Sequence, residues 1–257
     1  MKSVSEVLTT VIMIAIVLTV GLTIAYFAIT TIGNAVATAS YELSVNAFTT
    51  LTSNYDLIIN GGSYMVEFPE RDIGLGYNLT GKRLEVVVNV NTQNIVLVND
   101  SSIYEVYIKG PNAVGARESI LYGRGGLIVD SPSLLPILVE HYIPGKGQYI
   151  VLNTSRISLF TSSYITDTTN VTILYIVYSD LSPSVLGGAS ARRLKLSLVG
   201  MASNESTRII TGPTTINITV TLYNNGQIIQ TESRLLVVSN TILKIYYREL
   251  IVRAVIS

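Results

Sequence analysis

His141 is the only histidine in this 257-residue chain, and it follows Glu140 in the segment Leu-Val-Glu-His-Tyr. A histidine beside a carboxylate is a pairing that general acid–base catalysis uses, for example in a hydrolase. The segment has the composition of a β-strand, and no Gly-x-Ser-x-Gly nucleophile elbow accompanies it. We therefore predict a structural histidine and no enzyme. The rival hypothesis is a membrane-tethered extracellular hydrolase that uses His141 or an acidic pair.

The residue types that commonly bind metal ions or phosphate are scattered along the chain and form no recognisable site. There is no cysteine, so a single histidine leaves transition metals without their preferred ligands. The aspartates match no calcium-loop signature, and the dispersed ones are Asp56, Asp72, Asp130, Asp167 and Asp180. The glycine-rich segment from Tyr122 to Gly126 lacks the Lys-Ser/Thr ending of a phosphate loop. We predict a hairpin loop there, and no metal or small-molecule cofactor.

Six sites match the N-glycosylation signal Asn-x-Ser/Thr without a proline in the middle. Their asparagines are Asn78, Asn99, Asn153, Asn170, Asn204 and Asn217. All six lie in the part of the chain whose pattern predicts β-structure. This distribution indicates exposure outside the cell and predicts N-linked glycans, whereas the plain alternative at each site is an unmodified surface asparagine.

The charge pattern excludes one class of partner. Seventeen Lys and Arg balance 17 Asp and Glu, charged residues make up 13% of the chain, and there is no basic run. Proteins that bind nucleic acids present a basic patch to the phosphates. We therefore predict no nucleic-acid partner.

The element with the strongest signal is the N-terminal segment. From Val7 to Ile32 the sequence is almost wholly apolar, and Ile16 lies near the middle of this stretch. A membrane-spanning helix needs about 20 such residues, and a secretory signal peptide has a shorter apolar stretch. The threonine hydroxyls within it can bond to carbonyls one turn earlier. A helix that is apolar on all sides must be enclosed by lipid or by other helices.

Two features of this helix suggest contacts with another helix. Gly21, Ala25 and Ala28 form a small-residue stripe that would let a neighbouring backbone approach, although incidental small residues facing lipid are an equal alternative. Glu6 stands at the entrance of the apolar stretch, where a carboxylate needs the membrane interface or a partner such as the amino terminus of an adjacent chain. Its alternative role is a favourable interaction with the helix dipole.

The helical pattern continues beyond the apolar stretch. Apolar residues recur at steps of three and four, at Val36, Ala39, Leu43, Ala47 and Leu51. We predict one helix from about Val4 to Ser53, about 75 Å long at 1.5 Å per residue. Asn54 is predicted to end it in the left-handed conformation.

After residue 54 the apolar period changes to two. Leu84 to Val90 and Ile216 to Leu222 alternate as half-buried strands do, and further short runs follow at regular intervals. Asn224-Asn225-Gly226 predicts a tight hairpin. We predict an α+β chain in which residues 1–54 form the leader and long helix. Residues 55–257 then form an antiparallel, Ig-like β-sandwich, as one domain or two, with glycine-rich loops at Gly110–Gly115, Gly123–Gly126 and Pro183–Gly188.

The head from Ser3 to Ile12, Ser-Val-Ser-Glu-Val-Leu-Thr-Thr-Val-Ile, resembles the N-terminus of archaeal type IV pilins and pilin-like fibre proteins. In that family Val-Ser-Glu-Val leads into an uninterrupted apolar helix. The resemblance implies that a prepilin peptidase cuts before the helix, which then packs with its copies in a filament core. Family leaders end in a basic residue followed by Gly or Ala. This chain has Met1-Lys2-Ser3, so the implied cut follows Lys2 or Ser3.

The resemblance further implies a membrane-inserted precursor, an assembly machinery, and a homo-oligomeric helical filament on the cell surface. Adhesion is the use that we expect. The sixteen tyrosines would suit a wettable contact surface, although the general preference of tyrosine for strands accounts for most of them. The assembly contacts are expected at Glu6, Ile16, Gly21, Ala25 and Ala28. The main alternative is a monomeric binding or envelope protein that the same helix anchors permanently in the membrane.

Overall fold

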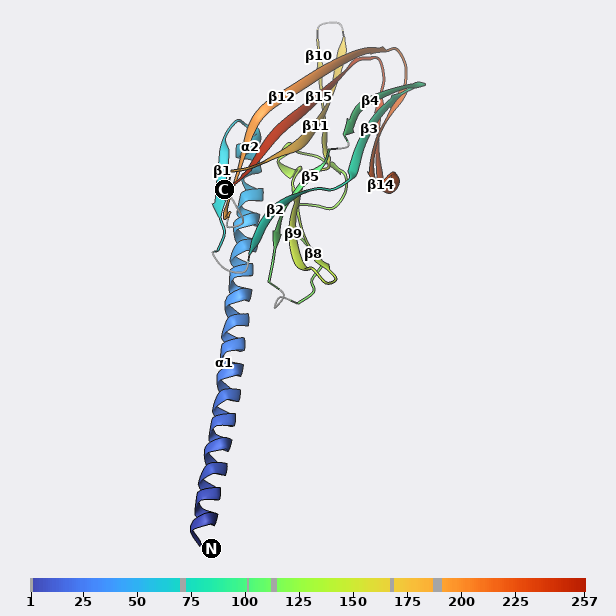
Figure 1. The fold of residues 1–257 in the computed structure, drawn as a ribbon. Helices are drawn as coiled ribbons and strands as arrows, with labels where there is room; N and C mark the ends of the chain where they lie inside the picture. Colours follow the sequence, from blue (N-terminus) through green and yellow to red (C-terminus); the bar gives the residue numbers. More distant parts are fainter. Residues whose placement is uncertain (1, 70–72, 101, 112–114, 167–168, 187–190) are drawn as a thin grey trace.

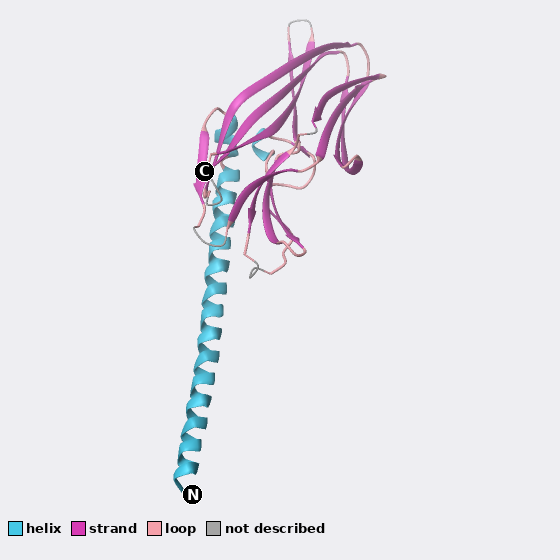
Figure 2. Ribbon diagram, viewed as in Figure 1, coloured by secondary structure: helices cyan, strands magenta, loops and turns pink. Residues whose placement is uncertain are grey.

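A computed structural model describes the backbone of residues 2–69, 73–100, 102–111, 115–166, 169–186 and 191–257, and the side chains of the first helix from Leu8 onward. Helix α1 (Lys2–Ser53) is continuous, and its N-terminal half projects away from everything else (Figure 1). The remaining described chain is almost entirely strand, apart from the short helix α2 (Tyr55–Ile59) and a 3-10 turn at Pro132–Leu134 (Figure 2). The predicted long helix and β-rich remainder are therefore confirmed.

Helix α1 ends at Ser53, as predicted, but the predicted conformation of Asn54 is wrong. Its φ of −93° and ψ of 16° are not left-handed. The Asn54 backbone N–H donates to Thr50 O at 3.2 Å, and its side-chain amide donates to the same oxygen at 2.8 Å. These two bonds satisfy a terminal carbonyl of α1 without a left-handed residue, and α2 begins at the next position.

The strands of the described residues form three sheets. Sheet A has the order β1 (Ser63–Glu67), β12 (Arg193–Ile210), β15 (Thr241–Ile256), β11 (Asn170–Val185), β10 (Ile157–Ile165) and β7 (Ile128–Val129). Sheet B has the order β2 (Gly74–Leu79), β5 (Tyr104–Lys109), β9 (Gly147–Asn153), β8 (Ile137–Ile143) and β6 (Ser119–Tyr122). Sheet C has the order β14 (Gln227–Val238), β13 (Thr214–Asn224), β3 (Lys82–Val90) and β4 (Gln93–Asp100).

The pairing is mostly antiparallel, but sheet A is mixed, and this corrects the predicted all-antiparallel arrangement. Strands β11 and β15 run parallel from the pair Asn170 and Thr241 to the pair Val185 and Ile256. Strand β10 is also parallel to β7. Parallel partners need a long crossover, and here β12, β13 and β14 lie between β11 and β15 in the sequence. The sheet order therefore does not define the predicted Ig-like sandwich.

Two turn predictions have different outcomes. The hairpin between β13 and β14 has Asn225 and Gly226 at its tip with φ of 50° and 82°, as the Asn-Asn-Gly sequence predicts. The predicted loop from Pro183 is wrong at its start, because Pro183 lies inside β11. Strand β10 pairs with β11 only as far as Tyr178, so Pro183 stands where β11 has a free edge and proline is tolerated. Residues 187–190 and 112–114 of the predicted loops lie outside the described residues.

Among the residues that the structure describes, two hydrophobic cores share sheet A. One core joins the end of α1, α2 and sheet B to one part of sheet A, and it includes Phe48, Leu138 and Val252. The other core joins sheet C to the rest of sheet A and includes Val86 and Ile176. Because sheet A contributes strands to both cores, one long sheet holds the β region together.

Candidate functional site: the exposed helix and its junction with the β region

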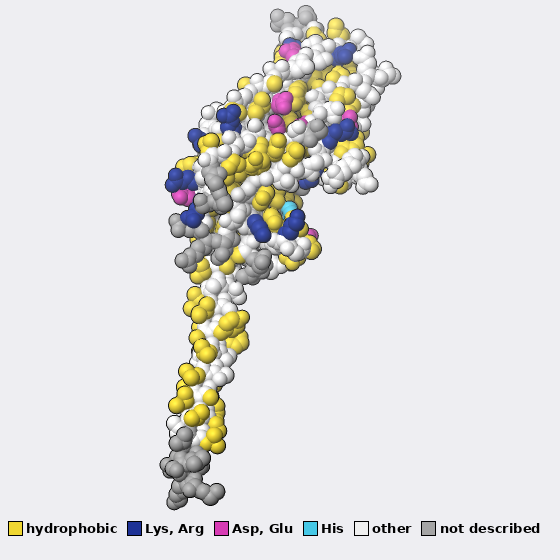
Figure 3. Space-filling model, viewed as in Figure 1, with side chains coloured by type: hydrophobic (Ala, Val, Ile, Leu, Met, Phe, Trp, Pro, Cys, Tyr) yellow, Lys and Arg dark blue, Asp and Glu magenta, His cyan; other side chains and the backbone are white. Residues whose placement is uncertain are grey.

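From Leu8 to Ile32, α1 is apolar and uncovered, and Figure 3 shows one face of this part of the helix. Every large apolar side chain from Leu8 to Ile32 is between 50% and 71% exposed. The hydroxyls of Thr19 and Thr23 donate to carbonyls one turn earlier, both at 2.8 Å, and Thr30 does so at 3.0 Å. These bonds are the ones predicted for the threonines. Among the described residues this is the one helix long and apolar enough to cross a membrane.

The predicted assembly residues lie on this uncovered part of α1. Ile16 is exposed, and a Cβ added to Gly21 would meet nothing within 4 Å. Ala25 and Ala28 are exposed at helical spacing from Gly21, so the small-residue stripe is free to meet another helix or lipid. The backbones of Lys2, Ser3 and Glu6 belong to α1, but their side chains lie outside the described residues.

The β region begins to cover α1 at Ala37, along one stripe of the helix. The stripe advances by four and three residues and runs on into α2; its buried members are Ala37, Tyr41, Ser44, Phe48, Leu51, Tyr55 and Ile58. The apolar residues that predict the helical continuation do not all lie on this stripe. Val36 and Leu43 are 43% and 60% exposed, Ala47 is partly buried against the core, and Leu51 is fully buried.

The choice of the packed face has a physical cause. The buried stripe and its flank contain aromatic rings and also hydroxyl-bearing residues whose hydrogen bonds are satisfied within the helix. Ser44 donates to Ser40 O at 2.8 Å and Thr52 donates to Phe48 O at 2.7 Å. A buried hydroxyl with a partner costs little, so aromatic rings decide which face packs.

The opposite face of α1 continues the apolar surface past the point where the β region starts. Ile29 and Ile32 are exposed, and Val36, Ala39 and Leu43 follow at steps of four, three and four. One face of the helix therefore contacts the β region while the other face stays apolar and free as far as Leu43.

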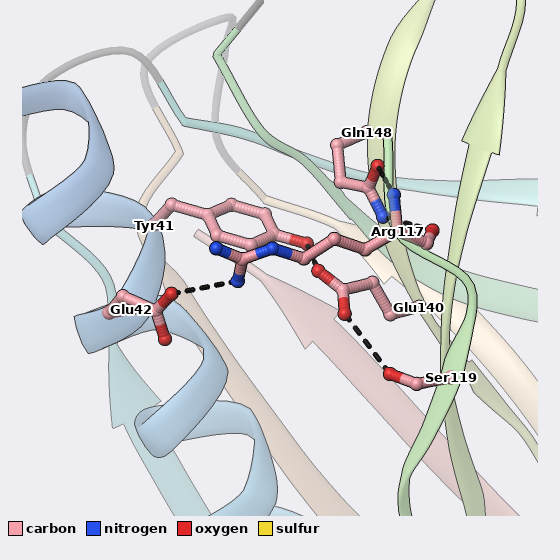
Figure 4. Close-up of polar contacts among 6 residues, drawn as sticks. All are labelled: Tyr41, Glu42, Arg117, Ser119, Glu140 and Gln148. Carbon is pink, nitrogen blue, oxygen red and sulfur yellow. Dashed lines mark hydrogen bonds and ion pairs between the residues drawn. The ribbon is translucent and has the colours of Figure 1, made fainter. Parts of the chain in front are cut away.

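A buried polar network fixes α1 to sheet B (Figure 4). The Tyr41 hydroxyl donates to Glu140 Oε1 at 2.7 Å, and the Ser119 hydroxyl donates to Glu140 Oε2 at 3.1 Å. The side chains of Tyr41 and Glu140 are both buried. Burial, followed by the hydrogen bond to Glu140, raises the pKa of Tyr41 far above its usual range, so the hydroxyl stays a donor.

Close approach at this junction depends on Gly110. A Cβ there would lie 2.5 Å from two carbons of the Tyr41 ring. Gln148, which is fully buried, exchanges two hydrogen bonds with the backbone of Arg117, at 2.7 and 3.1 Å. The Arg117 guanidinium then reaches Glu42 Oε1 at 3.0 Å on the surface of α1 (Figure 4). The network thus holds α1 at two neighbouring residues, Tyr41 through Glu140 and Glu42 through Arg117.

Sheet A supplies a second attachment through the end of α1 and α2. Tyr55 and Ser179 are fully buried and their hydroxyls are hydrogen bonded. The ring of Phe48 meets that of Phe68 edge to face, with centroids 5.7 Å apart. Tyr41 and Tyr55 are separated by about four helical turns of sequence, so the two attachments together fix the direction of α1 relative to the β region.

The candidate catalytic pair is divided between two faces of β8. Glu140 points into the junction and bonds to Tyr41, whereas His141 lies on the outer face of sheet B and stacks on Tyr149, with ring centroids 6.2 Å apart. Neighbouring residues of a strand point in opposite directions, so their adjacency in sequence does not bring them together. Among the described residues no three His, Asp or Glu side chains are grouped as metal ligands.

The glycine-rich segment from Tyr122 to Gly126 leads from the end of β6 toward β7 as a loop, as predicted. It is not the predicted hairpin loop, because β6 pairs with β8 in sheet B and β7 pairs with β10 in sheet A. The amides that follow it bind a carboxylate of the chain itself. Glu232 Oε2 accepts from the backbone N–H of Leu127 at 2.6 Å and of Ile128 at 3.3 Å. A Cβ on Gly126 would lie 2.8 Å from the same oxygen, so the glycine makes room for Glu232.

One acidic group lies where β11 of sheet A meets the end of β4 of sheet C. Tyr178 donates to Asp100 Oδ2 at 2.6 Å, and Asp180 lies nearby on the same strand. Burial, followed by the charges of Asp100 and Glu249, raises the pKa of Asp180 to about 6. Of the other dispersed aspartates, Asp130 pairs with Arg234, and residues 72 and 167 lie outside the described residues.

The six predicted glycosylation sites differ in exposure. Four asparagines are exposed on the β region: Asn78, Asn99, Asn170 and Asn204. Asn153 and Asn217 are half-buried. The Oδ1 atom of Asn153 accepts from the backbone N–H of Ser155 at 2.6 Å, and that serine is buried.

The residues of the junction were not among the predicted site residues. Tyr41, Phe48 and Tyr55 recur at steps of seven, and this aromatic spacing is the signal that would have identified the packed face. Nothing in the sequence pairs Gly110 or Glu140 with Tyr41. No protein-family model, curated protein or solved structure matches the chain. Function is therefore inferred from its own sequence and geometry.

Proposed function

We propose that this protein is the structural subunit of an extracellular filament of the type IV pilus kind, in which α1 forms the core and the β region forms the outer layer. Before assembly the helix is stored in the membrane, and during assembly contacts with other helices replace its contacts with lipid. The use that we propose for the filament is surface adhesion. N-linked glycans at exposed sequons would cover part of the outer layer.

The observation that carries the proposal is the length of the free apolar face. From Leu8 to Leu43 it covers 36 residue positions, about 54 Å at 1.5 Å per residue, against a hydrocarbon thickness of about 30 Å. Apolar side chains beyond the hydrocarbon would face water in a solitary anchored chain. In a bundle of copies they would be buried by neighbouring helices.

The buried junction also favours this function. Helices can pack in a regular filament only if every subunit presents its β region at the same angle to α1. The buried bonds of Tyr41 to Glu140 and of Tyr55 to Ser179 set that angle. The alternative, a monomeric surface protein anchored by the same helix, has no need for the apolar positions Val36 and Leu43.

Electron microscopy of material sheared from cells tests assembly, and N-terminal sequencing of the main band tests processing after Lys2 or Ser3. We expect filaments composed of this chain. Ile16→Lys should abolish them, because a charge would be buried in lipid and in the filament core alike. A chain that stays wholly in the membrane fraction, with an intact N-terminus and no filaments, would support the anchored monomer.

A further inference from the structure

The outer face of sheet B holds a pocket that the proposed function does not use. It has a volume of about 260 Å³ and is built from β2, β5, β8 and β9 with the turn after β8. Its polar and aromatic lining is Asn78, Glu105, Tyr107, His141, Lys146 and Tyr149. The volume is just below the roughly 300–1,000 Å³ of common small-molecule sites, which suits a ligand of about one ring.

The aromatic side chains form one continuous surface. Tyr107 meets Tyr149 edge to face with centroids 5.7 Å apart, and His141 stacks on Tyr149 in turn. Tyr107 stands opposite Gly76 in the pairing of β2 with β5. A Cβ on Gly76 would lie 2.7 Å from the Cζ and hydroxyl of Tyr107. The ring therefore leans across the glycine and lies over the sheet.

The charges around this surface do not cancel. Glu105 is bound by Lys82 at 2.7 Å, which neutralises the one carboxylate of the lining. Lys146 lines the pocket, and Lys109 shares its face because it stands opposite Tyr149. In the part of the chain that the structure describes, neither Lys109 nor Lys146 makes an ion pair. Figure 3 shows the single histidine beside basic side chains on this lobe.

We infer that this pocket binds an acidic pyranose, such as a uronic acid residue. The polarised C–H groups on one face of a pyranose suit the negative face of the Tyr107 ring. The side chains of His141 and Tyr149 offer donors and acceptors for hydroxyl groups, and Lys146 offers a cation for the carboxylate. The inference does not depend on filament assembly, since all these residues belong to one chain.

A matched pair of sugars tests it. The full-length chain is produced in a host that does not attach N-linked glycans, because a glycan on Asn78 would stand at the rim of the pocket. It is kept in a detergent without a sugar headgroup. Methyl β-glucuronide and methyl β-glucoside, which differ in the carboxylate, are then titrated by ligand-observed NMR. We expect the glucuronide to bind at least about fivefold more tightly, because only its carboxylate can pair with Lys146.

Variants separate stacking from charge. Tyr107→Leu should weaken glucuronide binding at least about tenfold, whereas Tyr107→Phe keeps the ring and should retain most of the affinity. Gly76→Ala should also weaken binding, because the added Cβ displaces the ring. Lys146→Gln should reduce the affinity for glucuronide to that for glucoside. Tyr164→Leu, a change at an exposed tyrosine of β10, is the control and should change nothing.

Three results would overturn the inference. They are the absence of glucuronide binding to the unsubstituted chain, equal affinity for the two sugars, and unchanged binding in Tyr107→Leu. Because the measurement uses dispersed chains, each of these results leaves the filament proposal standing. A failure to form filaments would equally leave the sugar site standing.

Discussion

The hydroxyl of Tyr41 on α1 lies 2.7 Å from Glu140 Oε1 on β8, and both side chains are shielded from solvent. This hydrogen bond connects the exposed helix to sheet B across 99 residues of sequence. Ser119 supplies the second donor to the same carboxylate. The orientation of the helix thus depends on the buried carboxylate of Glu140, which accepts hydrogen bonds from the hydroxyls of Tyr41 and Ser119.

Removing the Tyr41 hydroxyl should loosen the junction. Tyr41→Phe keeps the ring but leaves Glu140 Oε1 without its donor, so we expect a loss of about 1–3 kcal/mol in the free energy of unfolding. Denaturant unfolding of the detergent-solubilised chain measures it. Tyr164→Phe, at an exposed position, is the control and should be neutral. Equal stability of the two variants would show that the bond contributes nothing.

Gly110 makes a second prediction about the same junction. An added Cβ would lie 2.5 Å from the Tyr41 ring, so Gly110→Ala must displace the ring or the strand. We expect destabilisation by roughly 1–3 kcal/mol, the usual range for overpacking. Gly115→Ala is the matched control, because a Cβ there meets nothing within 4 Å. Thermal unfolding of both variants compares them, and equal midpoints would contradict the close packing.

Asp180 predicts a pH dependence of stability. Its folded pKa of about 6 lies above the value near 4 of an unfolded aspartate, so folding favours the protonated carboxyl. The contribution of the Asp180 carboxyl to the free energy of unfolding is fully present below about pH 4 and is lost as the pH rises through about 6. Because the side chain is only half-buried and solvent screens its charge, we expect a loss of about 1–2 kcal/mol. Asp180→Asn should remove this dependence and be the more stable protein above pH 6. Unfolding measured from pH 4 to 8 decides it, and parallel curves for the two proteins would contradict it.

The exposure of the sequons predicts an order of glycan occupancy. Asn78, Asn99, Asn170 and Asn204 should be modified, whereas the half-buried Asn153 and Asn217 should carry little or no glycan. Mass spectrometry of glycopeptides from protein isolated from its natural source measures this. Full occupancy at Asn153, whose side chain holds the Ser155 backbone N–H, would show that modification precedes folding there.

The sequence predicts the elements of this protein better than their partners. The extent of the helix to Ser53 and the Asn225-Gly226 hairpin follow from local sequence patterns, although the conformation of Asn54 does not. The parallel pairing of β11 with β15 does not, because alternation along a strand shows which face is buried and not which strand lies beside it.

The candidate sites show the same division. Exposure of Ile16 and of the Gly21 stripe follows from composition alone. The partnership of Tyr41 with Glu140 depends on a contact between distant segments, and so does the surface that Tyr107, Tyr149 and His141 form from three strands. Adjacency in sequence does not make a shared site, since the side chains of Glu140 and His141 lie on opposite faces of β8.

The most direct test of the central claim is the substitution Leu43→Asp. Leu43 is 60% exposed on the free face of α1, 11 residues and about 16 Å beyond Ile32, so it lies outside the hydrocarbon layer. An aspartate there should leave membrane insertion unchanged and prevent burial against a neighbouring helix. Val96→Asp, which is made at a site of 56% exposure on β4, is the control.

Cells that produce each variant are sheared, and filaments are counted by electron microscopy alongside the amount of chain in the membrane fraction. The filament account predicts normal membrane levels for both variants, normal filaments with Val96→Asp, and none or few with Leu43→Asp. Abundant filaments containing Leu43→Asp, or no filaments from the unsubstituted chain, would contradict it.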